Sequence, residues 1–237
     1  MNPVDAGWFV TFEGPEGSGK TIQAARIRDL AEGLGLPVVL TREPGGTPVG
    51  ELIRDILMAA GQDAVALGPR TDALLFNAAR AQHVDDVIRP ALARGALVIC
   101  ARYADSSVAY QGYGSGLPIA SLRELERFAT GGLRPDLTIL LDLPVEVGLA
   151  RKGGDEQQRF EAGMDLAYHR RVGDGFRAMA AEEPDRFLIL DAGLDPAAVF
   201  AHARLAISRL PGLAALASVP ARDAVDEPSS PALRMNR

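Results

Sequence analysis

Residues 8–21 read WFVTFEGPEGSGKT, a short apolar run followed by a glycine-rich segment that leads into a helical pattern. Residues 14–21 match G-x-x-x-x-G-K-[ST], and the match stands between an expected strand and an expected helix, as that motif requires. Its glycines let backbone N–H groups turn toward a phosphate, and the N-terminus of the following helix adds a partial positive charge. This stretch therefore predicts a P-loop in an α/β nucleotide-binding protein.

The residues of the P-loop are candidates for binding nucleotide phosphates. We expect Lys20 to reach the β- and γ-phosphates and the hydroxyl of Thr21 to ligate Mg²⁺. Only two of the 25 basic residues are lysines. A lysine at position 20 is therefore informative, because a compact ammonium suits a phosphate cradle better than a planar guanidinium does. The predicted nucleotide-binding residues are Gly14, Pro15, Glu16, Gly17, Ser18, Gly19, Lys20 and Thr21.

The wider pattern predicts one three-layer α/β domain. Apolar runs predict strands at residues 8–12, 38–40, 97–100, 137–141 and 187–190. Helical spacing predicts helices at residues 21–34, 48–58, 71–88, 119–130, 145–151, 164–182 and 197–210. Thr71 is the expected N-cap of the third helix, and residues 101–118 read as a glycine- and tyrosine-rich loop. The alternation predicts a five-stranded parallel sheet, helices on both faces and a binding crevice at the carboxyl ends of the strands.

The last part of the chain has a different composition. From Pro211 onward, prolines stand among alanines, serines and mixed charges without a sustained apolar period. Such a segment cannot bury enough apolar surface to offset the entropy lost on ordering. We therefore predict a folded domain at residues 1–210 and a disordered tail at residues 211–237.

Composition and charge exclude several classes of protein. The formal net charge of −6 argues against a nucleic-acid coat protein, because binding a phosphate backbone requires a broad basic surface. No run of eighteen apolar residues predicts a membrane span, and the N-terminus lacks the pattern of a secretory signal. Cys100, the lone cysteine, cannot form an internal disulfide. These features predict a cytoplasmic enzyme without nucleic-acid or membrane partners, and the three scattered histidines predict no metal site.

Three further polar motifs narrow the function, since a P-loop alone does not separate a GTPase, a motor ATPase and a small-molecule kinase. The absence of an N-K-x-D motif counts against a GTPase. Residues 41–47 read TREPGGT, residues 75–80 read LFNAAR and residues 102–112 read RYADSSVAYQG. With the P-loop, these motifs resemble the bacterial form of thymidylate kinase over residues 8–210. The resemblance implies transfer of the γ-phosphate of ATP to dTMP with Mg²⁺, in de novo and salvage dTTP synthesis, by a homodimer.

The resemblance also implies a set of substrate-binding residues. Phe76 would stack on the thymine ring, and Arg80, one helical turn away, would bind a base carbonyl. Ordinary core packing is the alternative interpretation of Phe76. Ser107 and Gln111 would meet the polar edge of the base, while Tyr110 would crowd the sugar 2′ position and select deoxyribose. A tight glycine-rich turn is the alternative for these three.

Charged residues complete the predicted site. Arg54 and Arg102 would grip the acceptor phosphate as guanidinium forks, although a surface ion pair remains the alternative for any single arginine. Glu16 and Glu43 would face the sugar hydroxyl and the phosphate–metal region.

The resemblance implies a mobile lid at about residues 151–160, a polar stretch that contains two adjacent glycines. In this family an arginine of the P-loop or the lid neutralises the charge of the transition state, and this P-loop has none. Arg159 is the first candidate for that role and Arg151 the second. The predicted catalytic residues are Lys20, Arg102, Arg151 and Arg159.

One position departs from the family pattern. The family signature D-R-Y reads Ala101-Arg102-Tyr103 in this chain, so a carboxylate expected near the phosphates and magnesium is missing. A nearby acid such as Glu13, Glu43 or Asp105 is a candidate to replace it. Two alternatives stay open from sequence: a kinase for another nucleoside monophosphate or a deoxynucleoside, and a nucleotide-binding regulatory protein with impaired turnover.

Overall fold

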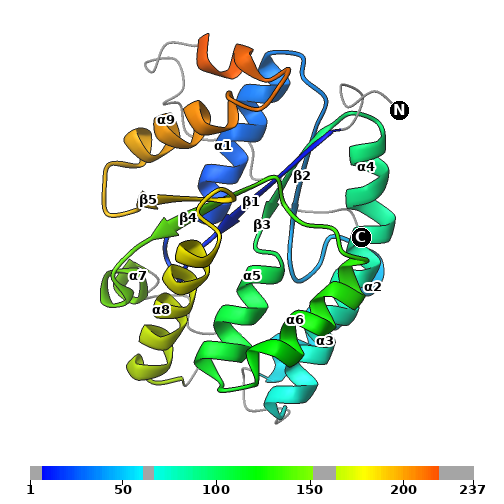
Figure 1. Cartoon of the computed structure of the whole chain (residues 1–237), viewed down its shortest axis with the longest axis vertical. Coiled ribbons are helices and arrows are strands. Elements are labelled where there is room, and N and C mark those ends of the chain that lie inside the picture. Colours follow the sequence, from blue (N-terminus) through cyan, green and yellow to red (C-terminus); the bar gives the residue numbers. More distant parts are fainter. Residues whose placement is uncertain (1–6, 61–66, 152–163, 219–237) are drawn as a thin grey trace.

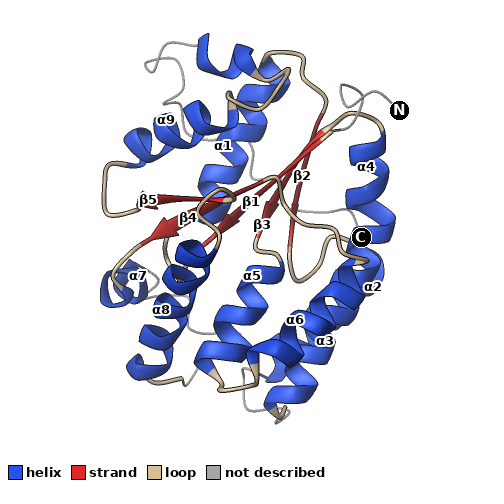
Figure 2. Cartoon of the chain, in the orientation of Figure 1, coloured by secondary structure: helices blue, strands red, loops and turns tan. Residues whose placement is uncertain are grey.

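The computed structural model describes residues 7–60, 67–151 and 164–218, and these form an all-parallel five-stranded sheet flanked by helices (Figures 1 and 2). The strand order is β2-β3-β1-β4-β5. The strands are β1 (Trp8–Glu13), β2 (Val38–Arg42), β3 (Leu97–Ala101), β4 (Leu137–Asp142) and β5 (Phe187–Asp191). The predicted three-layer fold with a five-stranded parallel sheet is confirmed.

Helices cover both faces of the sheet (Figure 1). They are α1 (Lys20–Gly33), α2 (Pro48–Ala60), α3 (Pro69–His83), α4 (Arg89–Ala93), α5 (Ala104–Ser107), α6 (Ile119–Thr130), α7 (Val145–Arg151), α8 (Leu166–Glu182) and α9 (Pro196–Ile207). Two π-helical segments, η1 (Val84–Ile88) and η2 (Val108–Gly114), and the 3₁₀ helix η4 (Ala214–Ser218) complete the described elements. No described helix is both long and apolar enough to span a membrane.

The sequence of the central strand β1 is almost continuously apolar because both of its faces are buried. Val10 and Phe12 face a core shared with α1 and α9, whereas Phe9 faces a second core formed with η1 and α4. A strand buried on both faces has no polar side to alternate with. In register, Phe12 pairs with Ala101 of β3, so the P-loop leaves the sheet beside the end of β3.

Two local predictions were wrong, one for the start of α3 and one for residues 101–118. The helix assigned an N-cap at Thr71 begins at Pro69 behind Gly68, and proline is suited to the first helical turn. The segment 101–118, expected to be a loop, contains α5 and η2. Gly112 and Gly114 reflect close packing rather than turns: a Cβ on Gly112 would overlap the side chain of Ile119, and one on Gly114 would crowd Tyr168.

The boundary predicted for a disordered tail at residue 211 was also wrong. Leu213 and Leu216 are buried in the same core as α9, and η4 carries the second of them. The indole nitrogen of Trp8 donates to the carbonyl of Pro211 at 2.8 Å, and Arg204 donates to the carbonyl of Leu216 at 3.2 Å. The fold therefore extends at least to residue 218, while residues 219–237 and most of the predicted lid lie outside the described residues.

Candidate active site

A cavity of about 540 Å³ opens at the carboxyl ends of the strands. The P-loop lines it from Glu16 to Thr21, and Ala101 lines it from the end of β3. Four arginines from separate segments also line the cavity: Arg42, Arg54, Arg102 and Arg151. The structure thus gathers most of the predicted phosphate-binding residues around one space, as expected for the binding edge of a parallel sheet.

The P-loop adopts a conformation that its glycines make possible. Gly14, Gly17 and Gly19 all have positive φ values, of 138°, 70° and 88°. The ammonium of Lys20 turns back into the loop, where it donates to the carbonyls of Gly14 at 2.9 Å and Pro15 at 2.7 Å. A cation is therefore held at the centre of the phosphate cradle.

Arg102 joins the P-loop to η2. Its φ of 67° is the one positive value among the described residues other than glycine, an arrangement that costs conformational energy and tends to occur at functional sites. The guanidinium forms an ion pair with Glu16 and lies 4.8 Å from the ring centroid of Tyr110. It also donates to the Tyr110 hydroxyl at 3.1 Å. Three predicted site residues are therefore in direct contact.

Two further arginines meet at the loop after β2. Arg42 and Arg54 both donate to the carbonyl of Pro44, at 3.1 and 3.2 Å. Burial and the neighbouring charge of Arg42 lower the pKa of Arg54. Guanidinium groups held this close favour an anion between them, so this pair suits a phosphate.

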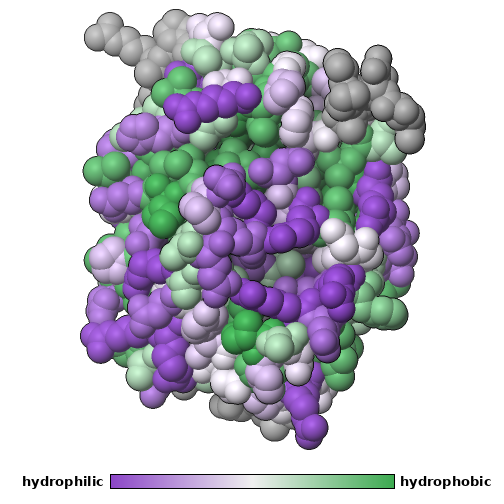
Figure 3. Space-filling view, viewed as in Figure 1, coloured by the Kyte–Doolittle hydropathy of each residue, from purple (hydrophilic) through white to green (hydrophobic). Residues whose placement is uncertain are grey.

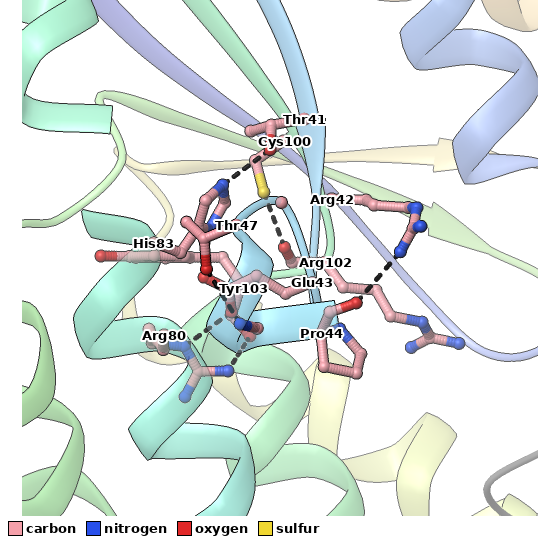
Figure 4. A network of polar contacts seen from close by, with 12 residues as sticks. Thr41, Arg42, Glu43, Pro44, Thr47, Arg80, His83, Cys100, Arg102 and Tyr103 are labelled. Carbon is pink, nitrogen blue, oxygen red and sulfur yellow. Dashed lines mark hydrogen bonds and ion pairs between the residues drawn. The ribbon is translucent and has the colours of Figure 1, made fainter. Parts of the chain in front are cut away.

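A buried polar network connects the same loop to α3 (Figure 4). One carboxylate oxygen of Glu43 accepts from Nε of Arg80 at 2.8 Å, and the other lies 3.0 Å from Nδ1 of His83. The terminal nitrogens of Arg80 donate to the side chain of Asn77 and to the carbonyl of Tyr103, each at 3.1 Å. Glu43 lines the cavity, but both of its oxygens have partners within this network.

The residues predicted to bind the base lie on α3, α5 and η2 beside this network, rather than in the wall of the phosphate cavity. Phe76 is half-buried on α3. The buried hydroxyl of Ser107 has no hydrogen-bond partner among the described residues. Gln111 donates through Nε2 to Asp72 at 2.8 Å, which fixes the orientation of its amide.

Of the three candidates to replace the missing carboxylate at position 101, Glu43 lines the cavity but Glu13 and Asp105 do not. Glu13 is fully buried and accepts from the backbone N–H of Tyr103 at 2.7 Å and the hydroxyl of Ser106 at 2.6 Å. Burial, together with the charge of Asp105, raises its pKa to about 7. Asp105 itself binds Arg186 through both oxygens, at 2.7 and 2.8 Å. Neither Glu13 nor Asp105 lines the cavity.

Sequence reasoning missed three polar residues of the site. Arg42 ends β2 directly beside Ala101 in the parallel register. Asp72 and His83 lie on α3 with Phe76 and Arg80, at spacings of four, four and three residues that place all four on one helical face. That spacing is the signal that would have identified Asp72 and His83.

Of the two arginines proposed for the lid, the structure describes only Arg151. Arg151, the last residue of α7, lines the cavity and donates to the carbonyl of Ala192 at 3.0 Å. Arg159 lies outside the described residues.

Comparison with known proteins agrees with this geometry. The family model for thymidylate kinase matches residues 12–202. A thymidylate kinase of Thermomicrobium roseum is 54% identical over 193 residues, which cover 81% of this chain and 90% of the relative. One of Pseudomonas fluorescens is 50% identical over 205 residues, covering 86% and 94%. The crystal structure of thymidylate kinase from Ehrlichia chaffeensis superposes with a TM-score of 0.69 at 32% identity, covering 85% of this chain and 99% of that one. The chain therefore belongs to the thymidylate kinase family, and its reaction is the phosphorylation of dTMP by ATP.

Proposed function

We propose that the residues around the phosphate cavity carry out this reaction with Mg²⁺, by positioning and charge stabilisation and without a covalent enzyme intermediate. The observation that carries the proposal is that a single cavity joins the P-loop to Arg54 and Arg102. A donor phosphate on the P-loop and an acceptor phosphate on these arginines would then face each other in one space. In-line phosphoryl transfer requires that arrangement.

On the donor side, Lys20 would exchange the carbonyls of Gly14 and Pro15 for the β- and γ-phosphates of ATP. Thr21 lines the cavity in the first turn of α1, so its hydroxyl suits a Mg²⁺ ligand. Mg²⁺ commonly takes only one or two protein ligands, and when bound it neutralises phosphate charge. The residues present therefore fit the ion, although Ala101 offers it no donor.

On the acceptor side, the phosphate of dTMP would compete with Glu16 for the guanidinium of Arg102. Glu16, once released, would accept a hydrogen bond from the sugar hydroxyl. Tyr110 packs against both residues, and its ring would occupy the space that a 2′-hydroxyl requires. This packing supports a preference for deoxyribose.

The base would bind between α3 and η2, with Phe76 stacked on the thymine ring. All three nitrogens of Arg80 donate to protein groups, but each terminal nitrogen keeps a second N–H for a base carbonyl. Because Asp72 takes the Nε2 donor of Gln111, the amide oxygen of Gln111 is left to accept from N3–H of thymine. The unpartnered hydroxyl of Ser107 supports a further polar contact.

For the cation that stabilises the transition state, the contact of Arg151 with the cavity supports a direct role. Arg159 stays a candidate from the lid. Comparing kcat for Arg151→Met and Arg159→Met at saturating ATP and dTMP separates the two, since an arginine that acts mainly in the transition state lowers kcat rather than raising KM.

We also propose that the protein works in the cytoplasm as a homodimer. Val49, Leu52 and Ile56 form an exposed apolar stripe on α2, and Leu74 on α3 and Phe128 on α6 are exposed as well. Helix α2 packs beside α3, and α3 beside α6, so these side chains belong to one layer (Figure 1). A second copy of the chain would cover them. Leu52→Glu should convert a dimer to a monomer in light scattering.

A panel of phosphate acceptors tests the proposed function. With ATP and Mg²⁺, we expect the highest kcat/KM for dTMP, a lower value for its ribose counterpart, and little reaction with thymidine or purine monophosphates. A preference for another monophosphate would contradict the assigned base contacts. Nucleotide binding without turnover would instead support a regulatory protein.

A further inference from the structure

His83 joins the substrate-side helix α3 to the loop after β2 (Figure 4). Its side chain is completely buried, and both ring nitrogens have partners. Nδ1 lies 3.0 Å from a carboxylate oxygen of Glu43, and Nε2 lies 2.6 Å from the hydroxyl of Thr41. The ring also packs against Gly46, where a Cβ would lie 2.8 Å from Nε2. Thr41 of β2 and two positions of the following loop, Glu43 and Gly46, therefore contact one histidine.

The partners of the ring define its hydrogen bonding. The carboxylate of Glu43 only accepts, so Nδ1 of His83 carries a proton and donates. In the neutral ring, Nε2 then accepts from the hydroxyl of Thr41. Both bonds lie in a water-poor interior, where a lost partner leaves a polar group unsatisfied. The ring orientation is thus fixed from two sides.

The fixed ring in turn limits the movement of Glu43. While one carboxylate oxygen accepts from His83, the other is held toward Nε of Arg80 at 2.8 Å. That bond and those to Asn77 and Tyr103 determine the plane of the Arg80 guanidinium. If the bond from His83 is lost, Glu43 can rotate and the guanidinium loses one of its three anchors.

We propose that His83 is a positioning residue for the acceptor nucleotide: through Glu43 it sets the guanidinium plane of Arg80, and through Thr41 and Gly46 it holds the end of β2, where Arg42 lies, and the loop that follows. It raises the affinity for dTMP without touching it. The inference rests on the proposed contact between Arg80 and the base. It gives a role to a histidine for which the sequence offered none.

Two substitutions test the proposal through a split between KM values. His83→Leu removes both hydrogen bonds while filling most of the space. His83→Asn keeps an N–H near the place of Nδ1 and so keeps the bond to Glu43. We expect His83→Leu to raise KM for dTMP by about tenfold, which corresponds to about 1.4 kcal/mol of binding free energy. KM for ATP should stay within about twofold of its natural value. His83→Asn should recover most of the affinity for dTMP.

Results of other kinds would overturn the proposal. An equal rise in both KM values, or an Asn variant no better than the Leu variant, would reduce His83 to a structural residue. If His83→Leu fails to fold, the comparison of His83→Asn with His83→Gln still decides. The longer Gln side chain places its amide toward Thr41 rather than Glu43, so we expect His83→Gln to raise KM for dTMP by about tenfold and His83→Asn to stay near normal. The control is His202→Leu, which changes an exposed histidine on α9 and should alter neither KM value.

A double substitution separates this inference from the proposed role of Arg80. If Arg80 binds the base, Arg80→Met alone raises KM for dTMP, and adding His83→Leu raises it little further. No effect of Arg80→Met on KM for dTMP would sink the assigned base contact. A full additional increase in the double variant would retain that contact and refute positioning through Arg80.

Discussion

Gly17 of the P-loop and Gly148 of α7 meet backbone against backbone. A Cβ on Gly17 would overlap the carbonyl oxygen of Gly148, and a Cβ on Gly148 would overlap the carbonyl oxygen of Glu16. The absence of two side chains therefore allows α7 to lie directly against the phosphate-binding loop. Because Arg151 is the last residue of α7, the same contact delivers its guanidinium to the cavity.

This contact predicts an unusual result for Gly148→Ala. Alanine is favoured over glycine in a helix by about 1 kcal/mol, so helix propensity alone would stabilise the protein. We expect instead a fall in kcat of about tenfold or more, because α7 must move away from Glu16 and takes Arg151 with it. Gly173→Ala on α8 is the matched control, since a Cβ there meets only ordinary contacts. Unchanged kcat in Gly148→Ala would show that the contact is dispensable.

The ammonium of Lys20 leads to a second prediction. It is a positive charge held inside the P-loop by the carbonyls of Gly14 and Pro15, and a preorganised charge of this kind contributes about a hundredfold or more to turnover. Lys20→Ala should therefore lower kcat by at least about that factor while the circular dichroism spectrum stays unchanged. Lys20→Met, which keeps most of the length of the side chain but not its charge, should be equally impaired. Near-normal turnover in either variant would contradict the assigned role.

The packing of Leu216 gives a third prediction, on stability. This side chain is completely buried, although it lies beyond the boundary that the sequence predicted for the folded domain. Leu216→Ala should lower the free energy of unfolding by about 2–5 kcal/mol, the range for a leucine truncated in a core. Leu205→Ala, at a 43% exposed position on α9, should cost about 1 kcal/mol or less. Urea denaturation of both variants measures the difference.

The burial of Glu126 leads to a fourth prediction, on how the stability of the protein depends on pH. It lies on α6 in the wall of a second cavity of about 350 Å³, on a face where hydrophilic side chains surround a hollow (Figure 3). Burial raises its pKa from 4.5 to about 8, and Arg80 opposes the shift only in part. An acid with a raised pKa in the folded state keeps its proton longer than it does in the unfolded chain.

The sign of the effect follows from that difference. As pH rises from about 4.5 to about 8, the unfolded chain loses the proton first, so the free energy of unfolding falls. Glu13 acts in the same direction up to about pH 7. Between pH 6 and 9 the free energy of unfolding of the natural protein should fall by on the order of 2 kcal/mol more than that of Glu126→Gln. Glu124→Gln, at an exposed position, is the control, and parallel pH profiles for all three proteins would show that Glu126 ionises normally.

Local sequence patterns were enough to predict the fold and the P-loop, because each depends on residues that are close together in the sequence. The strands were recognisable as apolar runs, and the glycines and Lys20 stand within eight residues. The missed features depend on contacts between distant residues. His83 meets Glu43 across 40 positions and Gln111 meets Asp72 across 39, and neither pairing leaves a local pattern.

The helical nature of residues 101–118 was hidden for a related reason. Gly112 and Gly114 read as turn residues in the sequence, yet they are glycines because Ile119 and Tyr168 occupy the space of their side chains. The second of these neighbours lies on α8, more than fifty residues away. Only the packed structure distinguishes that use of glycine from a turn.

Ala101 is the position where the chain departs from its family, and the structure sharpens the prediction made for it. The residue ends β3 in register with Phe12 on one side and Arg42 on the other, and it lines the phosphate cavity. A longer side chain there would reach the cavity in which we propose that the phosphates and Mg²⁺ bind. Because Glu13 and Asp105 are directed elsewhere, neither supplies the missing carboxylate to the cavity.

We therefore expect an active enzyme that requires a high concentration of Mg²⁺, with Thr21 and the phosphates holding the ion. Ala101→Asp should lower the Mg²⁺ concentration for half-maximal rate and raise kcat by up to about tenfold, or roughly 1.4 kcal/mol. Ala101→Asn is the matched control, because it has nearly the same shape but no charge and should shift the titration much less. Titrating Mg²⁺ against rate decides between the possibilities. Activity only in the aspartate variant would mean that the natural chain is inactive, whereas three identical titrations would show that position 101 does not influence the metal.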